Sequence, residues 1–307
     1  MTKVLSPKQL ARAIGVSESS LKRWSDDGLL NAGRTAGGHR RIELAEAVRF
    51  IRATGASVVR PDLIGLADLA ALGPGFAQAN DVERQIHKAM ESGNSQQLRA
   101  MLQSLYLAGW SLAAIFDGPM RSALVEIGKM WLHQEWGLVV EHRATEMCIE
   151  AVNQLRMLCT PRQSGAPVAV GSAAEFDPYM LPSLMVATVA GEAGFMDVNL
   201  GTITPPSVLL NAARHYQASL AWVSLSASPD AGQTVEDLQK LHANLAAFGC
   251  SLLVGGRLLA SIPAERRAGL VVVSSMAEFA SLASSAIALR TASGPHASTP
   301  ATLPPHQ

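Results

Sequence analysis

Charged residues are scarce in this chain of 307 residues, of which 16% are charged and 48% hydrophobic. The three cysteines are an odd number without a repeated spacing, which excludes a disulfide framework. No apolar run reaches the roughly 18 residues that span a bilayer, and the polar N-terminus does not resemble a secretory signal. We therefore expect a cytoplasmic protein with no membrane partner, whose middle and C-terminal parts are well packed.

Common enzyme motifs are also missing. There is no Ser/His/Asp triad, no Cys-rich metal site and no phosphate-binding loop of known spacing. We therefore do not expect an enzyme. The net charge is zero, so a preference for nucleic acid cannot be argued from the whole chain. Residues 1–60, however, hold eleven Lys and Arg against five Asp and Glu, which is typical of a basic module on a neutral body.

Two short helices are predicted at the N-terminus. The first covers residues 6–15, because Ser6 is a suitable N-cap, Pro7 suits the first helical position and Gly15 ends the pattern. The second begins after Ser17. Together they form a helix-turn-helix whose second helix reads DNA. The exposed start of that helix offers three candidate DNA contacts, Ser20, Lys22 and Arg23.

A short basic hairpin follows, with its tip in residues 34–42, and residues 43–54 return to helix. Gly37 and Gly38 let this tip approach a duplex closely. Its cations suit phosphate contacts or a minor-groove probe. The candidate DNA contacts of the hairpin are Arg34, His39, Arg40 and Arg41.

This order of motifs resembles the winged-helix DNA-binding domain of MerR-type regulators. The pattern Trp-x-x-x-Gly-Leu-Leu stands at Trp24 to Leu30, and the wing pattern Gly-Gly-His-Arg-Arg stands at Gly37 to Arg41. The resemblance covers about the first 70 residues. It implies a double-stranded DNA operator as partner, and a homo-oligomer, either a dimer or a tetramer.

Helical spacing of apolar residues fills the middle of the chain, after a linker in residues 57–80. Helices of this length predict a small four-helix bundle. The expected helices cover residues 81–93, 95–108, 111–131 and 136–159.

The pattern changes near Pro161 to alternating strands and helices. Nearly continuous apolar strands in this alternation predict a parallel sheet covered on both faces. The strands are expected at residues 167–171, 196–201, 219–225, 250–255 and 269–274, and the helices at 181–194, 206–217, 233–248 and 275–290. The fold class is thus multidomain α and α/β: a winged helix with its linker (1–75), a four-helix bundle that caps a ligand (80–160), a Rossmann-like doubly wound domain (165–290) and a disordered tail (291–307).

Residues 80–290 resemble the cobalamin-binding module of corrinoid methyltransferases and of light-sensing MerR regulators. The resemblance rests on a lid signature in the bundle and on motifs at the carboxyl ends of the strands, where open α/β sheets bind ligands. Small side chains there let a tetrapyrrole or its tail pass close to the backbone. The implied cofactor-binding residues are Trp131, Glu141, His142, Glu175, Phe176, Asp177, Tyr179, Ser224, Ser226, Gly255 and Gly256.

This sequence departs from the family at both cobalt-binding histidines. The family's loop motif has a histidine where Asp177 stands and a glycine where Met180 stands, and the histidine expected directly after the lid tryptophan is Leu132. A carboxylate is a poor substitute for imidazole on cobalt. Cobalamin held without a protein ligand, a metal-free linear bilin, haem and an empty structural pocket are the alternatives.

Of these alternatives, the residues favour a biliverdin-like bilin, because an aspartate can pair with protonated pyrrole nitrogens. Phe176, Tyr179 and Met180 would crowd a corrin's nucleotide tail while suiting an open-chain pigment. If the pigment is attached covalently, only Cys148, Cys159 and Cys250 are candidates.

The sequence therefore predicts a DNA-binding transcriptional regulator with a tetrapyrrole chromophore between bundle and Rossmann-like domain. The light response and the change of oligomeric state are implied by the resemblance alone. Two other classes remain open: a corrinoid methyl-transfer protein, and a ligand-free dimeric repressor whose C-terminal part is an assembly platform.

Overall fold

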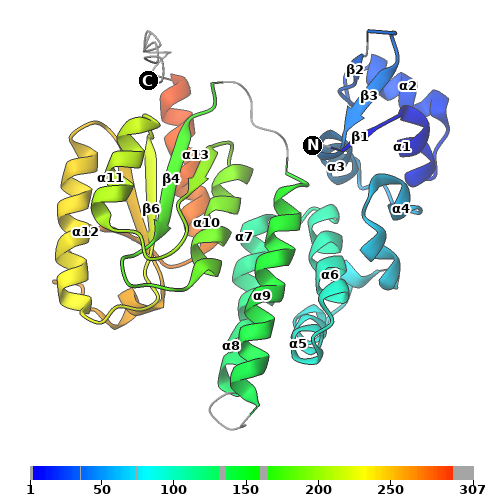
Figure 1. The fold of residues 1–307 in the computed structure, drawn as a ribbon. Helices are drawn as coiled ribbons and strands as arrows, with labels where there is room; N and C mark the ends of the chain where they lie inside the picture. The colour runs from blue at the N-terminus through cyan, green and yellow to red at the C-terminus, as the bar shows by residue number, and fades with distance from the viewer. Residues whose placement is uncertain (1–2, 35, 74, 131–135, 160–164, 293–307) are drawn as a thin grey trace, which may run out of the picture.

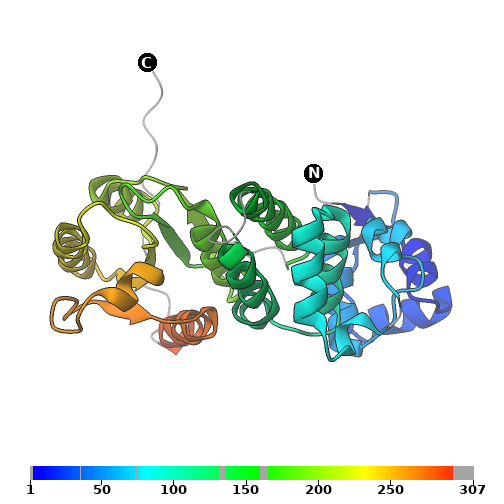
Figure 2. The same cartoon turned by 90° about the horizontal axis from the view of Figure 1, so that it is seen from below.

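The computed structural model describes residues 3–34, 36–73, 75–130, 136–159 and 165–292. It has three parts, and the helical bundle lies between the winged-helix head and the α/β domain in two perpendicular views (Figures 1 and 2). This arrangement confirms the predicted fold class. Within the described residues, no helix combines the length and the apolar character needed to cross a membrane.

The head is a helix-turn-helix closed by a small antiparallel sheet of order β1-β3-β2. Ser6 and Gln9 form a reciprocal capping box at the first helix, and Ser17 caps the second. Trp24 packs against Phe50 with ring centroids 5.2 Å apart. The elements are β1 (Val4–Leu5), α1 (Pro7–Ala13), α2 (Glu18–Asp26), β2 (Gly33–Arg34), β3 (Arg40–Glu43) and α3 (Leu44–Thr54).

The predicted linker is more ordered than the sequence indicates, because it forms three short helical turns. Ile64 and Phe76 are buried, and Asp68 pairs with Arg99 of the bundle at 2.8 Å. The linker is thereby fixed to the bundle. Its turns are α4 (Pro61–Ile64), η1 (Ala67–Ala71) and η2 (Phe76–Gln78).

The prediction of one continuous helix in the bundle is wrong. The helix expected at 111–131 is divided by a π-helical turn in which Gly118 adopts φ −89° and ψ −107° and Pro119 follows. Proline lacks the amide hydrogen of a regular turn, so a π-turn absorbs the break. The bundle comprises α5 (Val82–Ser92), α6 (Ser95–Leu107), α7 (Leu112–Ile115), η3 (Phe116–Met120), α8 (Arg121–Met130) and α9 (Gly137–Arg156).

The α/β domain has a fully parallel five-stranded sheet of order β5-β4-β6-β7-β8. The order reverses between β4 and β6, which makes their carboxyl ends the switch point of the sheet. All five strands occur where the apolar runs predict them. They are β4 (Val168–Ala173), β5 (Met196–Asn199), β6 (Leu220–Ser224), β7 (Ser251–Gly255) and β8 (Val271–Val273).

Two helices cover each face of this sheet. The first face packs against α10 (Met180–Glu192) and α13 (Met276–Ala292), and the second against α11 (Pro206–His215) and α12 (Ala231–Ala246). A 3-10 turn, η4 (Arg257–Ser261), follows β7. The last helix extends slightly past its predicted end at residue 290, and the rest of the expected disordered tail (293–307) lies outside the described residues.

The bundle is fastened to the α/β domain at α13. Both carboxylate oxygens of Asp117 in η3 accept backbone hydrogen bonds from the start of this helix, from Met276 N and Ala277 N at 2.8 Å each. A second tie joins Arg156 of α9 to the buried Asp197 of β5. A carboxylate at a helix N-terminus satisfies open amides and matches the helix dipole.

Arg52 of α3 connects all three parts. Its guanidinium donates to the carbonyls of Tyr106 and Trp110 in the bundle, and lies 3.8 Å from the centre of the Tyr106 ring. It also lies 3.8 Å from a carboxylate oxygen of Glu192, at the end of α10. Glu192 in turn accepts a hydrogen bond from Leu112 N at 2.9 Å. One arginine thus contacts the head, the bundle and the α/β domain.

Candidate functional sites

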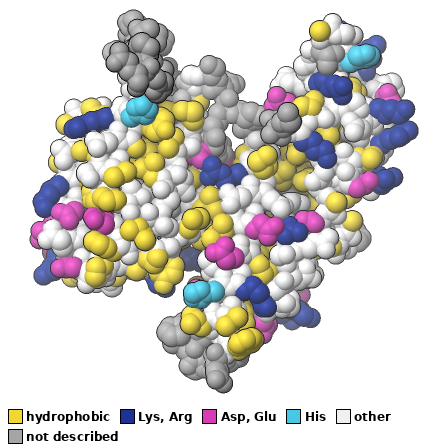
Figure 3. Space-filling model, viewed as in Figure 1, with side chains coloured by type: hydrophobic (Ala, Val, Ile, Leu, Met, Phe, Trp, Pro, Cys, Tyr) yellow, Lys and Arg dark blue, Asp and Glu magenta, His cyan; other side chains and the backbone are white. Residues whose placement is uncertain are grey.

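Lys and Arg side chains gather over the head in Figure 3. Lys22 and Arg23 are exposed on α2, and Arg34, His39 and Arg41 are exposed in the hairpin. A groove runs between α2 and the hairpin, lined by Lys22, Arg34 and Arg41 among others. Exposed cations beside a reading helix fit contacts to DNA phosphates.

Arg40 and Ser20, both predicted DNA contacts, have partners inside the head. Arg40 donates to the carboxylate of Asp26 at 2.5 Å and to the carbonyl of Lys22 at 3.4 Å, so it holds the hairpin against α2. The hydroxyl of Ser20 lies 2.9 Å from that of its helix cap, Ser17. We therefore assign positioning roles to Arg40 and Ser20.

Exposed apolar side chains gather at one end of the bundle and of the α/β domain. The start of α9 and the carboxyl edge of the sheet both point toward the lower end of the molecule in Figure 1. The sequence analysis singled out three of these side chains (Phe176, Tyr179 and Met180) and missed the others, although Trp136 stands in the lid segment. The exposed residues are Trp136, Leu138 and Val139 on the bundle, and Phe176, Tyr179, Met180 and Ile203 on the α/β domain.

The loops after β4 and β5 each have one residue with a strained backbone. Phe176 and Ile203 adopt φ angles of 65° and 52°, in a region that non-glycine residues seldom occupy. Such conformations cost about 1–3 kcal/mol and persist where surrounding contacts hold them. Here Ile203 N donates to the carbonyl of Asp177 at 3.2 Å, and Asp177 N to that of Ala174 at 3.0 Å.

Asp177 is fully buried and its carboxylate is already used by the backbone. One oxygen accepts from Ser226 N at 2.5 Å and Ala227 N at 3.4 Å, and the other from Tyr179 N at 3.0 Å. These bonds tie the loop after β4 to the loop after β6. The expected pairing of Asp177 with a pyrrole is not what its carboxylate does in this structure.

The serine and glycine motifs at the ends of β6 and β7 also face the protein interior. A Cβ on Gly256 would lie 2.2 Å from the carbonyl oxygen of Leu225, and one on Gly255 would lie 3.1 Å from Val273. The chain's own strands therefore occupy the space that these glycines leave. Ser226 is buried, and the enclosed hydroxyl of Ser224 has no hydrogen-bond partner among the described residues.

Of the three predicted lid residues, the structure describes Glu141 and His142. Trp131 lies outside the described residues, as do residues 132–135. His142 is exposed on α9, and its Nε2 atom lies 3.7 Å from the carboxylate of Glu141. The structure places this pair on α9 of the bundle.

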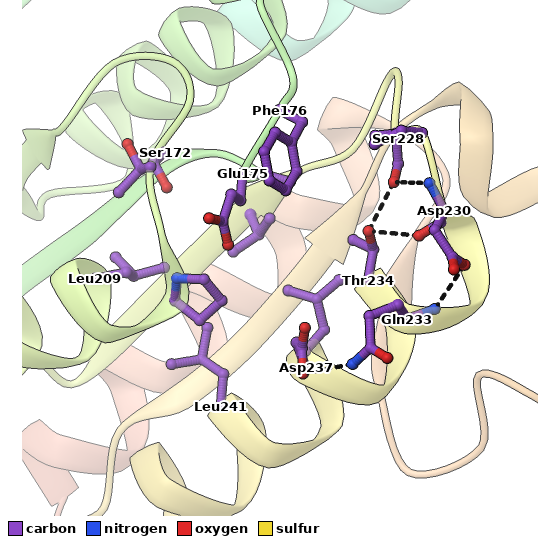
Figure 4. Close-up of a pocket in the computed structure, with 16 residues that line it drawn as sticks. Ser172, Glu175, Phe176, Leu209, Ser228, Asp230, Gln233, Thr234, Asp237 and Leu241 are labelled. Atoms are coloured by element: carbon purple, nitrogen blue, oxygen red, sulfur yellow. Dashed lines mark hydrogen bonds between the residues drawn. The ribbon is translucent and has the colours of Figure 1, made fainter.

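Glu175 belongs to a separate pocket at the switch point, on the α11 and α12 side (Figure 4). Glu175 and Phe176 form one wall. The opposite wall is a hydrogen-bonded group, in which the hydroxyls of Ser228 and Thr234 lie 2.7 Å apart and Thr234 donates to the carbonyl of Asp230. The pocket encloses about 80 Å³.

The three cysteines are free thiols. Burial raises the pKa of Cys148 and of Cys250 to about 12 each, so both stay protonated and unreactive at neutral pH. Cys159 is half-buried and accepts a hydrogen bond from the Tyr106 hydroxyl at 3.7 Å. Among the described residues, no cluster of three or more His, Cys, Asp or Glu could hold a metal ion.

Two family models match the chain. Residues 6–42 match the MerR family regulatory protein model, and residues 82–156 match the B12 binding domain model. The chain therefore joins a MerR-type N-terminal domain to a B12-binding-type domain, as the resemblances imply. No curated protein matches the chain.

The solved structures that resemble this fold include corrinoid proteins. The monomethylamine corrinoid protein of Methanosarcina barkeri is 18% identical with a TM-score of 0.51, over 67% of this chain and 99% of that one. A methanol:cobalamin methyltransferase complex from the same organism is 16% identical (71% and 86% covered, TM-score 0.35). A cobalamin-binding protein from Desulfitobacterium hafniense is 13% identical (68% and 99% covered, TM-score 0.36). The first likeness supports the fold of the bundle and α/β domain.

These findings contradict the bilin that the residues favoured. The match of residues 82–156 to the B12 binding domain model points to cobalamin instead. The error came from treating Asp177 as a partner for a pigment, whereas its carboxylate binds three backbone amides.

The residues that follow β4 do not fit a cobalt ligand. The carboxylate of Asp177 is enclosed, and none of the described histidines stands in the loop after β4.

Proposed function

We propose that this chain is a DNA-binding transcriptional regulator whose bundle and α/β domain form a corrinoid-sensing module. The observation that carries the proposal is the exposed basic face of α2 and the hairpin, within a domain that matches MerR regulators. Lys22, Arg23 and Arg41 contact phosphates on both sides of the groove that receives α2. Arg40 keeps the hairpin at the required angle to α2 through Asp26.

The small molecule in this proposal is cobalamin, held without a protein ligand to cobalt. The apolar side chains on both sides of the sheet edge support this, because they offer flat surface to a large ring. Trp136 and Leu138 contact the ring from the bundle, and Tyr179 and Met180 contact it from the α/β domain. No step of the proposal passes through the metal.

Arg52 is the proposed route from the sensing module to the head. A ligand that shifts the bundle against the α/β domain changes the distance between Glu192 and Tyr106, and Arg52 of the head binds both. A ligand shifts such an equilibrium only by its difference in affinity for the two arrangements. The DNA affinity of the head then depends on ligand occupancy.

The DNA half is tested by selecting binding sequences from a random duplex library with the full chain. Fluorescence anisotropy then measures the affinity for the selected duplex between 50 and 200 mM salt. We expect a specific complex whose affinity falls steeply with salt, because cations released from phosphates dominate such binding. Selection of no sequence above background would remove the regulator assignment.

The ligand half is tested by equilibrium dialysis of the full chain against cobalamin, with half of each sample illuminated. We expect bound cobalamin and a change in affinity for the selected duplex. The light response rests on the resemblance, and equal results in light and darkness would remove it while leaving cobalamin sensing intact.

A second candidate function is a ligand-free repressor in which the same apolar side chains join two copies. The specific observation for it is that Trp136 and Phe176 are 70% and 59% exposed, since exposed apolar patches often mark interfaces. Sedimentation separates the two: this candidate predicts a dimer or tetramer without cobalamin that Trp136→Ser dissociates.

A further inference from the structure

The sheet face beneath α10 is closed by a tryptophan of the central strand. Trp222 of β6 is 1% exposed, and its ring nitrogen donates to the hydroxyl of Ser183 on α10 at 3.0 Å. That hydroxyl donates in turn to the side-chain oxygen of Asn199 at 3.0 Å. A chain of hydrogen bonds therefore fixes the ring between sheet and helix.

The ring rests directly on the neighbouring strand. Gly171 of β4 is the register partner of Trp222, and a Cβ there would lie 2.1 Å from the ring. Glycine inside a strand often marks such a close approach. The space between β4, β6 and α10 is thus taken by the chain itself, two residues below the unpartnered hydroxyl of Ser224.

The other face of the sheet is equally closed to a large group. The pocket beside α11 and α12 encloses about 80 Å³. A cavity of about 150 Å³ is the size that admits a benzene molecule. The nucleotide tail of cobalamin ends in a benzimidazole, which is larger than benzene, so this pocket does not admit it.

We propose that Trp222 takes the place of a corrinoid's nucleotide tail, so that this chain recognises a corrinoid by its ring alone. The inference rests on the proposed function and adds to it which part of a corrinoid the chain recognises. Any tail stays outside the sheet, and complete and tail-less corrinoids bind equally well. Trp222, Gly171 and Ser183 are the residues that set this preference.

The test compares cobalamin with cobinamide, which has the corrin ring but no nucleotide, in equilibrium dialysis against the full chain. We expect dissociation constants within about threefold of each other. The same measurement on Trp222→Ala, which vacates the space of the ring, is expected to favour cobalamin over cobinamide at least tenfold. Phe248→Ala, at an exposed aromatic beyond the end of α12, is the matched control and keeps the wild-type ratio.

Each outcome decides. Wild-type chain that binds cobalamin at least tenfold more tightly than cobinamide overturns the inference, because the tail then has a site. If the wild type binds neither compound, the chain does not recognise a corrinoid by its ring, and the inference fails together with cobalamin sensing. If the wild type binds both compounds equally but Trp222→Ala shows the same ratio, Trp222 is not what excludes the tail and the inference fails alone. Trp222→Leu, with the same comparison, replaces Trp222→Ala if circular dichroism shows that the latter is unfolded.

Discussion

The head and the α/β domain both keep their sequence motifs in order, but they place the polar side chains of these motifs differently. Lys22, Arg23 and Arg41 are exposed, whereas Asp177 and Ser226 are buried and bound to one another's loops. A phosphate contact needs only an exposed cation on a rigid element. A ligand pocket needs empty space, and a single large side chain such as Trp222 removes it.

The largest expected effect is on the head. Replacing Lys22, Arg23 and Arg41 together by alanine should weaken binding of the selected duplex at least about 100-fold near 0.1 M salt, because each lost contact costs about 1–3 kcal/mol. The slope of log affinity against log salt should also fall by about three. Anisotropy titrations measure both. Lys240→Ala on α12 is the control, and an equal loss there, or an unchanged slope, contradicts the assignment.

The next largest effect tests whether the Trp222 ring fills the space beside β4 in the α/β domain. Gly171→Ala places a methyl group against the Trp222 ring and should lower the free energy of unfolding by about 3 kcal/mol, at the upper end for overpacked cores. In a Trp222→Leu background most of this cost should vanish, since the two sites are coupled. Urea unfolding followed by circular dichroism measures the free energy of unfolding of the wild type, the two single variants and the double variant. Equal costs in both backgrounds would show that the ring is not what meets the methyl group.

A smaller effect is expected at the buried carboxylate. Asp177→Asn keeps one acceptor oxygen but loses the charge, so it should destabilise the chain by about 2 kcal/mol, a typical value for hydrogen bonds to charged groups. Its affinity for DNA should not change. Asp230→Asn is the matched control, because asparagine caps α12 as well as aspartate does. A neutral result at Asp177 would mean that its three amide bonds contribute little.

The smallest effect concerns the junction between the parts. Burial raises the pKa of Glu192 above its ordinary 4.5, against the opposing hydrogen bond from Leu112 and the charge of Arg52. The stability that this group contributes is therefore fully present below pH 4.5 and is lost as the pH rises through the raised value. Relative to Glu192→Gln, the wild type should lose stability over that window. Urea unfolding from pH 4 to pH 8 measures it, and a constant difference contradicts it.

The order of elements was predictable because apolar spacing differs between helices and buried strands, as at Val168–Ala173. The π-turn at Gly118 was missed because the apolar spacing continues through Pro119. The DNA face was predictable, since exposure follows from charge. Asp177 meets Ser226 from 49 positions away, and Trp222 meets Gly171 only through strand register, so neither pairing is visible in the sequence. Gly171 inside β4 was the sequence signal that could have indicated a large side chain packed against this strand.

Asp117 determines how the molecule can be divided for study. The first two amides of α13 are satisfied by this carboxylate from the bundle. A fragment that begins after residue 160 retains every strand but leaves these amides open, and its last helix frays at the end that adjoins β8. Measurements on such a fragment would report the missing bundle as well as the sheet, which makes the uncut chain the appropriate unit for comparing ligands.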